Sequence, residues 1–257
     1  MLFVLALLLS FLIGSIPFGV LLGKMRGVDV RSVGSGNIGA TNVWRALGPT
    51  FGVLAFACDV LKGVAGPLIG RCLLPDSDWG IALCGIAAVA GHIFSPFLGF
   101  KGGKGISTSL GALFGLIPVV GVAAFALWCL VLALTRMISA ASVAACIALP
   151  VLALLIHWPT HTSLPAFLVA TLMSVFAFLK HIPNLKRIAN KTEPKIGTKK
   201  YAGDAQNDAI EDTGGDTDST DDTAKKMPEE VDTPNSPPLS QSTSRPDTLP
   251  NAPTNIH

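Results

Sequence analysis

The chain has 257 residues, of which 50% are hydrophobic and only 14% are charged, whereas about a quarter of the residues in soluble domains are charged. This composition excludes an ordinary soluble domain, and we expect no nucleic-acid partner. The charge is divided: residues 1–200 contain 16 Lys and Arg against 5 Asp and Glu, whereas residues 201–257 contain 3 against 12. We therefore expect a membrane domain with basic loops at 1–200 and a different, acidic segment at 201–257.

In chain order, apolar tracts occur at 1–23, 50–70, 79–98, 106–135, 137–157 and 164–179. A membrane-spanning helix needs roughly 20 predominantly apolar residues. The first tract has no basic leading segment and no small-residue cleavage site, so we expect a span and not a signal peptide. The fourth is too long for one untilted span, and Pro118 interrupts it. We divide it into a short helix at 106–117 and a longer one at 118–135.

This division predicts an all-α, polytopic membrane protein with about seven transmembrane helices, one of them short. With the amino terminus outside, seven spans place most Lys and Arg of the loops on the inner side, as the positive-inside rule requires. With six spans, Arg136 and the basic segment 180–200 would lie on the outer side, against the positive-inside rule. The sequence therefore predicts that the polar loops and the carboxyl terminus are cytoplasmic.

The first inner loop, residues 33–48, contains GSGNIG, which has the spelling of the dinucleotide-binding pattern G-x-G-x-x-G. That pattern requires a βαβ unit, but here a transmembrane segment precedes it, so we exclude dinucleotide binding. Glycines also let backbone N–H groups converge on an anion, and ATNVWRAL, which follows, predicts a helix amino terminus at the same place. The candidate anion ligands of this loop are Ser35, Asn37, Thr41 and Arg45.

The second inner segment, residues 91–108, contains KGGKGIST. It is not a Walker A loop, because Gly105 follows the lysine where that pattern requires Ser or Thr, so ATP hydrolysis is not indicated. Lys104 and the backbone of Gly102 and Gly103 are predicted to bind an anion. His92 is either a packed residue at the end of a span or part of the site.

The third inner segment, residues 180–197, follows the last predicted span. His181 offers a base or donor, Asn184 an orienting amide, Arg187 a cation and Glu193 a carboxylate. The lysines of this segment are expected to face lipid headgroups.

Polar residues also occur within or at the start of predicted spans. Asp59 and Lys62 are three residues apart on one helical face, so they can form an ion pair, either structural or in contact with a substrate. Ser139 and Ser142 begin a span from the inner side. Their hydroxyl groups face a ligand or bond back to their own helix.

The segment 201–257 is rich in Asp, Thr, Ser and Pro and almost lacks large apolar residues, so we predict that it is disordered and cytoplasmic. The five cysteines are scattered without a CxxC pair, and we expect neither a disulfide framework nor a metal site.

Three segments, in this order, resemble the signature segments of the bacterial acyl-phosphate-dependent glycerol-3-phosphate acyltransferases: GSGNIGATNVWRALG, GHIFSPFLGFKGGKGIST and KHIPNLKRIANKTEPKIG. The resemblance extends to IGSIPFGVLLGK, DVLKG and RMISAAS and covers about residues 1–200. The chain departs from the family at Asn190, where the third segment usually has Gly. The segment 201–257 has no expected counterpart.

The resemblance implies transfer of a fatty acyl group from acyl phosphate to the 1-hydroxyl of glycerol 3-phosphate, which gives 1-acylglycerol 3-phosphate and phosphate. This is the first acylation step of phospholipid synthesis, here on the cytoplasmic side of a bacterial inner membrane. The resemblance implies that no cofactor is needed. It also implies functional coupling to an enzyme that forms acyl phosphate. The implied catalytic residues are His181, Ser35 and Asn184, and the implied substrate and phosphate ligands are Arg45, Lys104, Gly102, Gly103, Asn37, Thr41, Ser142, Arg187 and Glu193.

Two questions stay open at the level of sequence. The proton of the attacking hydroxyl goes to His181 or to the phosphate of the donor, and Ser35 is a weaker candidate for a nucleophile because no base partner is evident. A transporter of a phosphorylated metabolite would also need an anion site, but it predicts internal repeats, and the three segments differ from one another.

Overall fold

The computed structural model describes residues 1–160 and 163–196, with side chains at 157–160 excepted, and all regular structure in these ranges is helical. The predicted all-α class is thereby confirmed. The acidic segment 201–257 lies outside the described residues, and its disorder stays a prediction.

The described helices are α1 (Leu2–Ser15), α2 (Phe18–Met25), α3 (Ala40–Leu47), α4 (Pro49–Leu73), α5 (Asp78–Ile93), the 3-10 turn η1 (Pro96–Leu98), α6 (Ile106–Leu116), α7 (Pro118–Thr135), α8 (Ile138–Thr160), α9 (Leu164–Leu179) and α10 (Ile182–Ala189). Among the described residues, five segments are long and apolar enough to cross a membrane, and α9 with α10 forms a sixth that bends by 51°. The short apolar helix α6 corresponds to the predicted short fourth span, but its 11 residues fall short of the length of a span, so seven spans stays a prediction.

The first predicted span is broken in the structure between α1 and α2. Pro17 lacks a backbone N–H and disfavours helical geometry in the preceding residue. The break frees carbonyl groups that need partners. The hydroxyl of Ser95 donates to the carbonyl of Ser15, and Nζ of Lys62 donates to that of Ile16, both at 2.7 Å. The break is therefore tied to α4 and to the chain after α5.

Small residues allow the central helices to approach closely. A β-carbon at Gly63 on α4 would overlap the carbonyl of Thr108 on α6, and one at Gly111 on α6 would overlap the carbonyl of Val60 on α4. Such contacts are typical of membrane helices, where association depends on close packing of backbones. The pair α4 and α6 thus forms a fixed centre around which the polar segments are placed.

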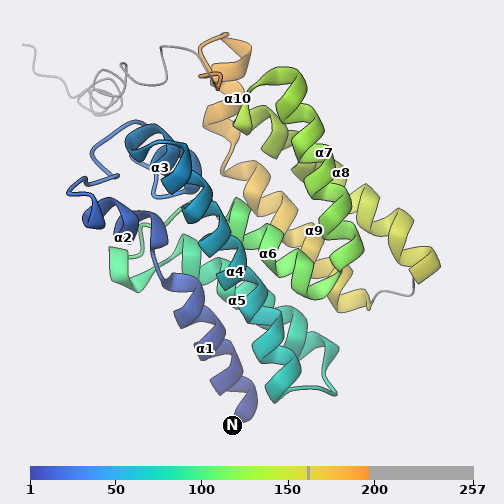
Figure 1. The fold of residues 1–257 in the computed structure, drawn as a ribbon. Coiled ribbons are helices and arrows are strands. Elements are labelled where there is room, and N and C mark those ends of the chain that lie inside the picture. Colours follow the sequence, from blue (N-terminus) through green and yellow to red (C-terminus); the bar gives the residue numbers. More distant parts are fainter. Residues whose placement is uncertain (161–162, 197–257) are drawn as a thin grey trace, which may run out of the picture. The chain divides into compact units, whose positions relative to one another are not determined.

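The three polar segments meet at one end of this helical unit. Helices α2, α3 and α10 lie at that end, away from the amino terminus (Figure 1). The expected helix within the first segment is present as α3, and the expected helix start after the second segment is present as α6 at Ile106.

Candidate active site

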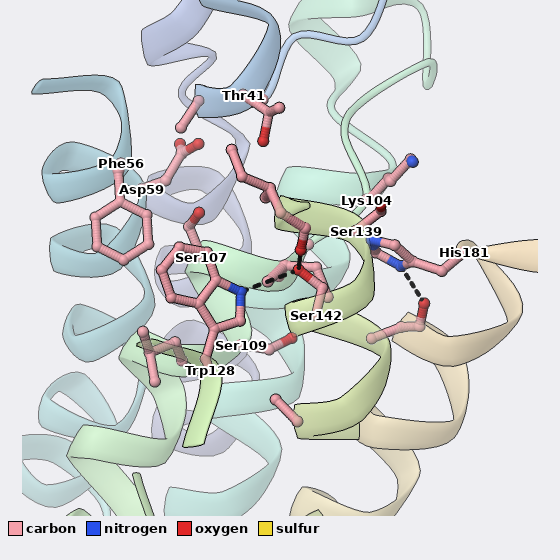
Figure 2. A pocket seen from close by; sticks show the side chains of 18 of the residues that line it. Thr41, Phe56, Asp59, Lys104, Ser107, Ser109, Trp128, Ser139, Ser142 and His181 are labelled. Atoms are coloured by element: carbon pink, nitrogen blue, oxygen red, sulfur yellow. Dashed lines mark hydrogen bonds between the residues drawn. The ribbon is translucent and has the colours of Figure 1, made fainter. Parts of the chain in front are cut away.

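A cavity of about 400 Å³ lies where the three polar segments converge. Its polar lining comes mainly from loops and helix ends, and its apolar lining comes from within α4, α6, α7, α8 and α9 (Figure 2). The predicted site residues that line it are Ser35, Asn37, Thr41, Arg45, Lys104, Ser142, His181, Asn184, Arg187 and Glu193. The cavity is suited to a molecule with an anionic head and an apolar chain.

The first segment is an organised loop, with Asn42 as its centre. This side chain is 1% exposed, and its Nδ2 donates to the carbonyl groups of Val30 at 2.6 Å and Val33 at 2.9 Å. Its Oδ1 accepts the backbone N–H of Ser35 at 3.0 Å. Gly34 has φ +65°, and a β-carbon there would overlap this oxygen. The sequence did not assign Asn42 to the site, because only the folded loop shows its partners.

Ser35 lies beside an amide and not beside a base. Its Oγ is 3.3 Å from Oδ1 of Asn42, and an amide oxygen does not remove a proton at neutral pH. A nucleophilic serine requires an adjacent base. This geometry favours Ser35 as a hydrogen-bonding group of the cavity over Ser35 as a nucleophile.

The second segment presents Lys104 to the cavity, and its Nζ donates to Oδ1 of Asn184. The prediction that the N–H groups of Gly102 and Gly103 bind an anion is wrong for this structure. They donate instead to the carbonyl groups of Ile93 at 3.0 Å and His92 at 3.1 Å. The two glycines let the loop lie directly against the end of α5, where a β-carbon would not fit.

The pKa of Lys104 is lowered to about 8. Burial is the largest cause, since it removes water from the ammonium group. The positive charges of Arg187 and Arg45 lower the pKa further, and Glu193 opposes them. These groups gather three cations and one carboxylate around the polar end of the cavity.

His181 lies between α9 and α10 and is held in one orientation. Its Nδ1 is 2.8 Å from the carbonyl of Ala177, and because a carbonyl only accepts, Nδ1 carries the hydrogen. In the neutral ring the other nitrogen, Nε2, then has a lone pair. Figure 2 shows His181 facing the cavity with this nitrogen on the cavity side. The geometry suits a proton acceptor.

Glu193 connects Asn184 and Arg187. Nδ2 of Asn184 donates to one carboxylate oxygen at 2.9 Å, and Nε of Arg187 donates to the other at 2.8 Å. Burial raises the pKa of Glu193, but the hydrogen bonds from Asn184 and Arg187 and the positive charge of Arg187 outweigh it and hold the pKa below its usual value. The carboxylate therefore stays ionised, and it orients the amide that contacts Lys104.

An aromatic group on α4 and α7 forms part of the apolar lining. Phe56, Phe125 and Trp128 stack with centroid separations of 5.9–6.4 Å. Nε1 of Trp128 donates to Oγ of Ser142 at 3.2 Å, and this hydroxyl donates to the carbonyl of Ile138 at 2.9 Å. Ser142 thus bonds back to its own helix, and it also lines the cavity, so its role as a substrate ligand stays a prediction. The aromatic residues were not predicted, because in an apolar span they carry no distinguishing signal.

Comparisons with known proteins show the family to which the chain belongs. The family described as glycerol-3-phosphate acyltransferase matches residues 4–191. Glycerol-3-phosphate acyltransferase 1 of Deinococcus radiodurans is 44% identical over 195 residues, which is 76% of this chain and 96% of the relative. The enzyme of the same name from Geobacter sulfurreducens is 41% identical over 188 residues, 73% of this chain and 94% of the relative.

A crystal structure of PlsY, an integral membrane glycerol 3-phosphate acyltransferase, in its glycerol 3-phosphate form is similar in fold, with a TM-score of 0.70 and 37% identity. The match covers 76% of this chain and 96% of that one. A lysophosphatidic acid form of the same protein matches with a TM-score of 0.68 and 36% identity, and it covers 77% of this chain and 97% of that one. The chain is a multi-pass integral membrane protein, and it belongs to the glycerol-3-phosphate acyltransferase family.

Proposed function

We propose that the protein transfers a fatty acyl group from acyl phosphate to the 1-hydroxyl of glycerol 3-phosphate and releases 1-acylglycerol 3-phosphate and inorganic phosphate. The observation that carries this proposal is the lining of the cavity. Arg45, Lys104 and Arg187 stand at its polar end, and Phe56 and Trp128 stand at its apolar end. Two phosphate-bearing substrates need several cations, and the fatty chain needs the apolar part.

The sequence favours acyl phosphate as the donor over a thioester. No His is followed five positions later by Asp, so the H-x-x-x-x-D motif of thioester-using acyltransferases is absent from the chain. Acyl phosphate is a mixed anhydride and is already activated. A covalent acyl-enzyme is therefore not required, which agrees with the lack of a base beside Ser35.

In the proposed reaction the 1-hydroxyl oxygen attacks the acyl carbon, and the bond from that carbon to the phosphate oxygen breaks. Nε2 of His181 accepts the hydroxyl proton, because its Nδ1 is engaged by Ala177. The proton then passes to the departing phosphate, which restores the neutral ring. In the alternative, the phosphate of the donor accepts the proton and His181 only orients glycerol 3-phosphate.

The cations would hold the phosphate groups during this step. Lys104 and Arg45 line the same cavity as His181, and Arg presents a fork that matches phosphate geometry. Glu193 and Asn184 fix the directions of Arg187 and Lys104. Holding reactants in one geometry contributes several kcal/mol to catalysis, up to about 7–11 kcal/mol in well-oriented systems.

We further propose that the site faces the cytoplasm of a bacterial cell, with the amino terminus outside. The support is the distribution of loop Lys and Arg, which gathers on the side of the three polar segments. An enzyme that forms acyl phosphate on the same side would supply the donor.

The proposal is tested with the purified protein in detergent, given glycerol 3-phosphate with either palmitoyl phosphate or palmitoyl-CoA. We expect release of phosphate and formation of lysophosphatidic acid with palmitoyl phosphate alone. Absence of product with palmitoyl phosphate, or equal rates with both donors, would contradict it.

Two variants with one control test the roles. His181→Ala is expected to lower kcat by about 10²–10⁴-fold, and Lys104→Ala is expected to raise the KM for substrate. Lys101→Ala is the control for Lys104→Ala, because Lys101 is exposed in the same loop and does not line the cavity. Unchanged kcat in His181→Ala would contradict both the base role and the orienting role of His181.

A further inference from the structure

Three ionisable side chains are buried together beside the cavity. Asp59 and Lys62 on α4 and His92 on α5 are 2–4% exposed. Nζ of Lys62 lies 2.7 Å from Oδ1 of Asp59 and donates to the carbonyl of Ile16 at 2.7 Å. The same carboxylate oxygen lies 3.7 Å from Nδ1 of His92. The expected ion pair of Asp59 and Lys62 is thus present. The ring of His92, 33 positions along the chain, lies beside the pair but beyond hydrogen-bond distance of the carboxylate.

His92 is in direct contact with the loop that carries Lys104. Its carbonyl accepts the N–H of Gly103. Its ring lies against the same glycine, since a β-carbon at Gly103 would overlap Nε2. A displacement of the His92 ring would therefore move Gly103, and with it Lys104, which is the next residue in the chain.

Stability alone does not account for the three groups. A buried ion pair offsets little more than the cost of removing its charges from water, and ionisable residues inside a membrane domain tend to mark functional sites. Asp59 and His92 both line the cavity, and Figure 2 shows Asp59 on the helix that also carries Phe56. Lys62 does not line the cavity, and its contact with Ile16 fixes it to the break between α1 and α2.

We infer that Lys62, Asp59 and His92 form a positioning chain that connects the break after α1 to the Gly102–Lys104 loop and fixes Lys104 in the cavity. This inference rests on the proposed function. These three residues act by positioning Lys104 and do not contact the substrate themselves in this role. Displacing Lys104 by about 1 Å would weaken its contact with phosphate, and misplacements of this size cost up to about 10²-fold in rate.

The variants Asp59→Asn and His92→Phe test the inference, since Asn keeps the shape of the Asp side chain and Phe keeps an aromatic ring, although a larger one, without ring nitrogens. We expect the KM for glycerol 3-phosphate or palmitoyl phosphate to rise about tenfold or more and hydrogen exchange at Gly102 and Gly103 to become faster. Ser10→Ala is the control, because Ser10 is also buried, donates to the carbonyl of Ala6 within α1, and does not line the cavity. If His92→Phe does not fold, His92→Gln replaces it.

A double-mutant cycle with Lys104→Ala separates positioning from general packing. If His92 acts through Lys104, His92→Phe has no further effect on kcat/KM in the Lys104→Ala background. Full additivity, together with unchanged exchange at Gly102 and Gly103, overturns the inference. An inactive wild-type protein would overturn the proposed function instead, and the exchange measurement would still decide whether His92 holds the loop.

Discussion

The pKa of Lys104 provides the sharpest test of how the cavity binds phosphate. Burial, with Arg187 and Arg45 nearby, lowers this pKa to about 8. If the charged ammonium binds a substrate phosphate, kcat/KM follows the protonated fraction of Lys104 in the free enzyme. The group is protonated below its pKa, so activity is retained at pH 7 and is lost as the pH rises through 8. The protonated fraction falls from roughly 90% at pH 7 to roughly 10% at pH 9, so kcat/KM should fall about tenfold.

The assay measures initial rates of lysophosphatidic acid formation at limiting glycerol 3-phosphate between pH 6.5 and 9.5. The second pKa of a phosphate monoester is about 6, so this substrate is mainly a dianion above pH 7 and adds little to the alkaline limb. Lys104→Arg should lack the alkaline limb, because a guanidinium stays protonated throughout this range. Lys101→Arg, in the same loop but outside the cavity, should keep the wild-type profile.

Two results would refute the reasoning. A kcat/KM that is constant between pH 7 and 9 would show that Lys104 is not the titrating phosphate ligand. An alkaline limb that persists unchanged in Lys104→Arg would assign the titration to another group.

Three further substitutions test the organisation of the site. Asn42→Ala leaves the N–H of Ser35 and the carbonyl groups of Val30 and Val33 without their partner. The free energy of unfolding in detergent should therefore fall by about 2–4 kcal/mol. An unchanged Tm would contradict the organising role of Asn42. Trp128→Ala removes one of the stacked aromatic side chains of the apolar lining. It should raise the KM for palmitoyl phosphate more than the KM for glycerol 3-phosphate. Equal effects on the two KM values would place the acyl chain elsewhere. Gly63→Val forces a side chain against the carbonyl of Thr108. Such overpacking should lower the free energy of unfolding by about 1–3 kcal/mol, which thermal unfolding measures. An unchanged stability would mean that α4 and α6 can separate without cost.

Local pattern was sufficient for the position and order of the long apolar helices. An apolar tract of about 20 residues predicts a span wherever it occurs, since lipid offers no partners for backbone polar groups. The short α6 followed from Pro118, and the helix α3 followed from ATNVWRAL. The three polar segments were recognisable because polar residues concentrate in each within about 18 residues: the first two are rich in glycines and hydroxyl groups, and the third is rich in cations.

The sequence was insufficient where a boundary or a role depends on distant partners. The break at Ile16 and Pro17 became visible only with Lys62 and Ser95 in place to satisfy the freed carbonyl groups. Glycines at 102 and 103 match an anion-binding loop in sequence. Packing against α5 commits their N–H groups to carbonyl oxygens instead.

By itself, then, the sequence determined an all-helical membrane domain with three polar segments and nearly all the polar groups of its cavity. The tertiary structure decided what each group touches: Asn184 lies between Lys104 and Glu193, and His92 lies between Asp59 and Gly103. The physical reason is that hydropathy and motifs are local properties of the chain. Hydrogen bonds and ion pairs between residues 33 or 80 positions apart exist only after the helices have packed.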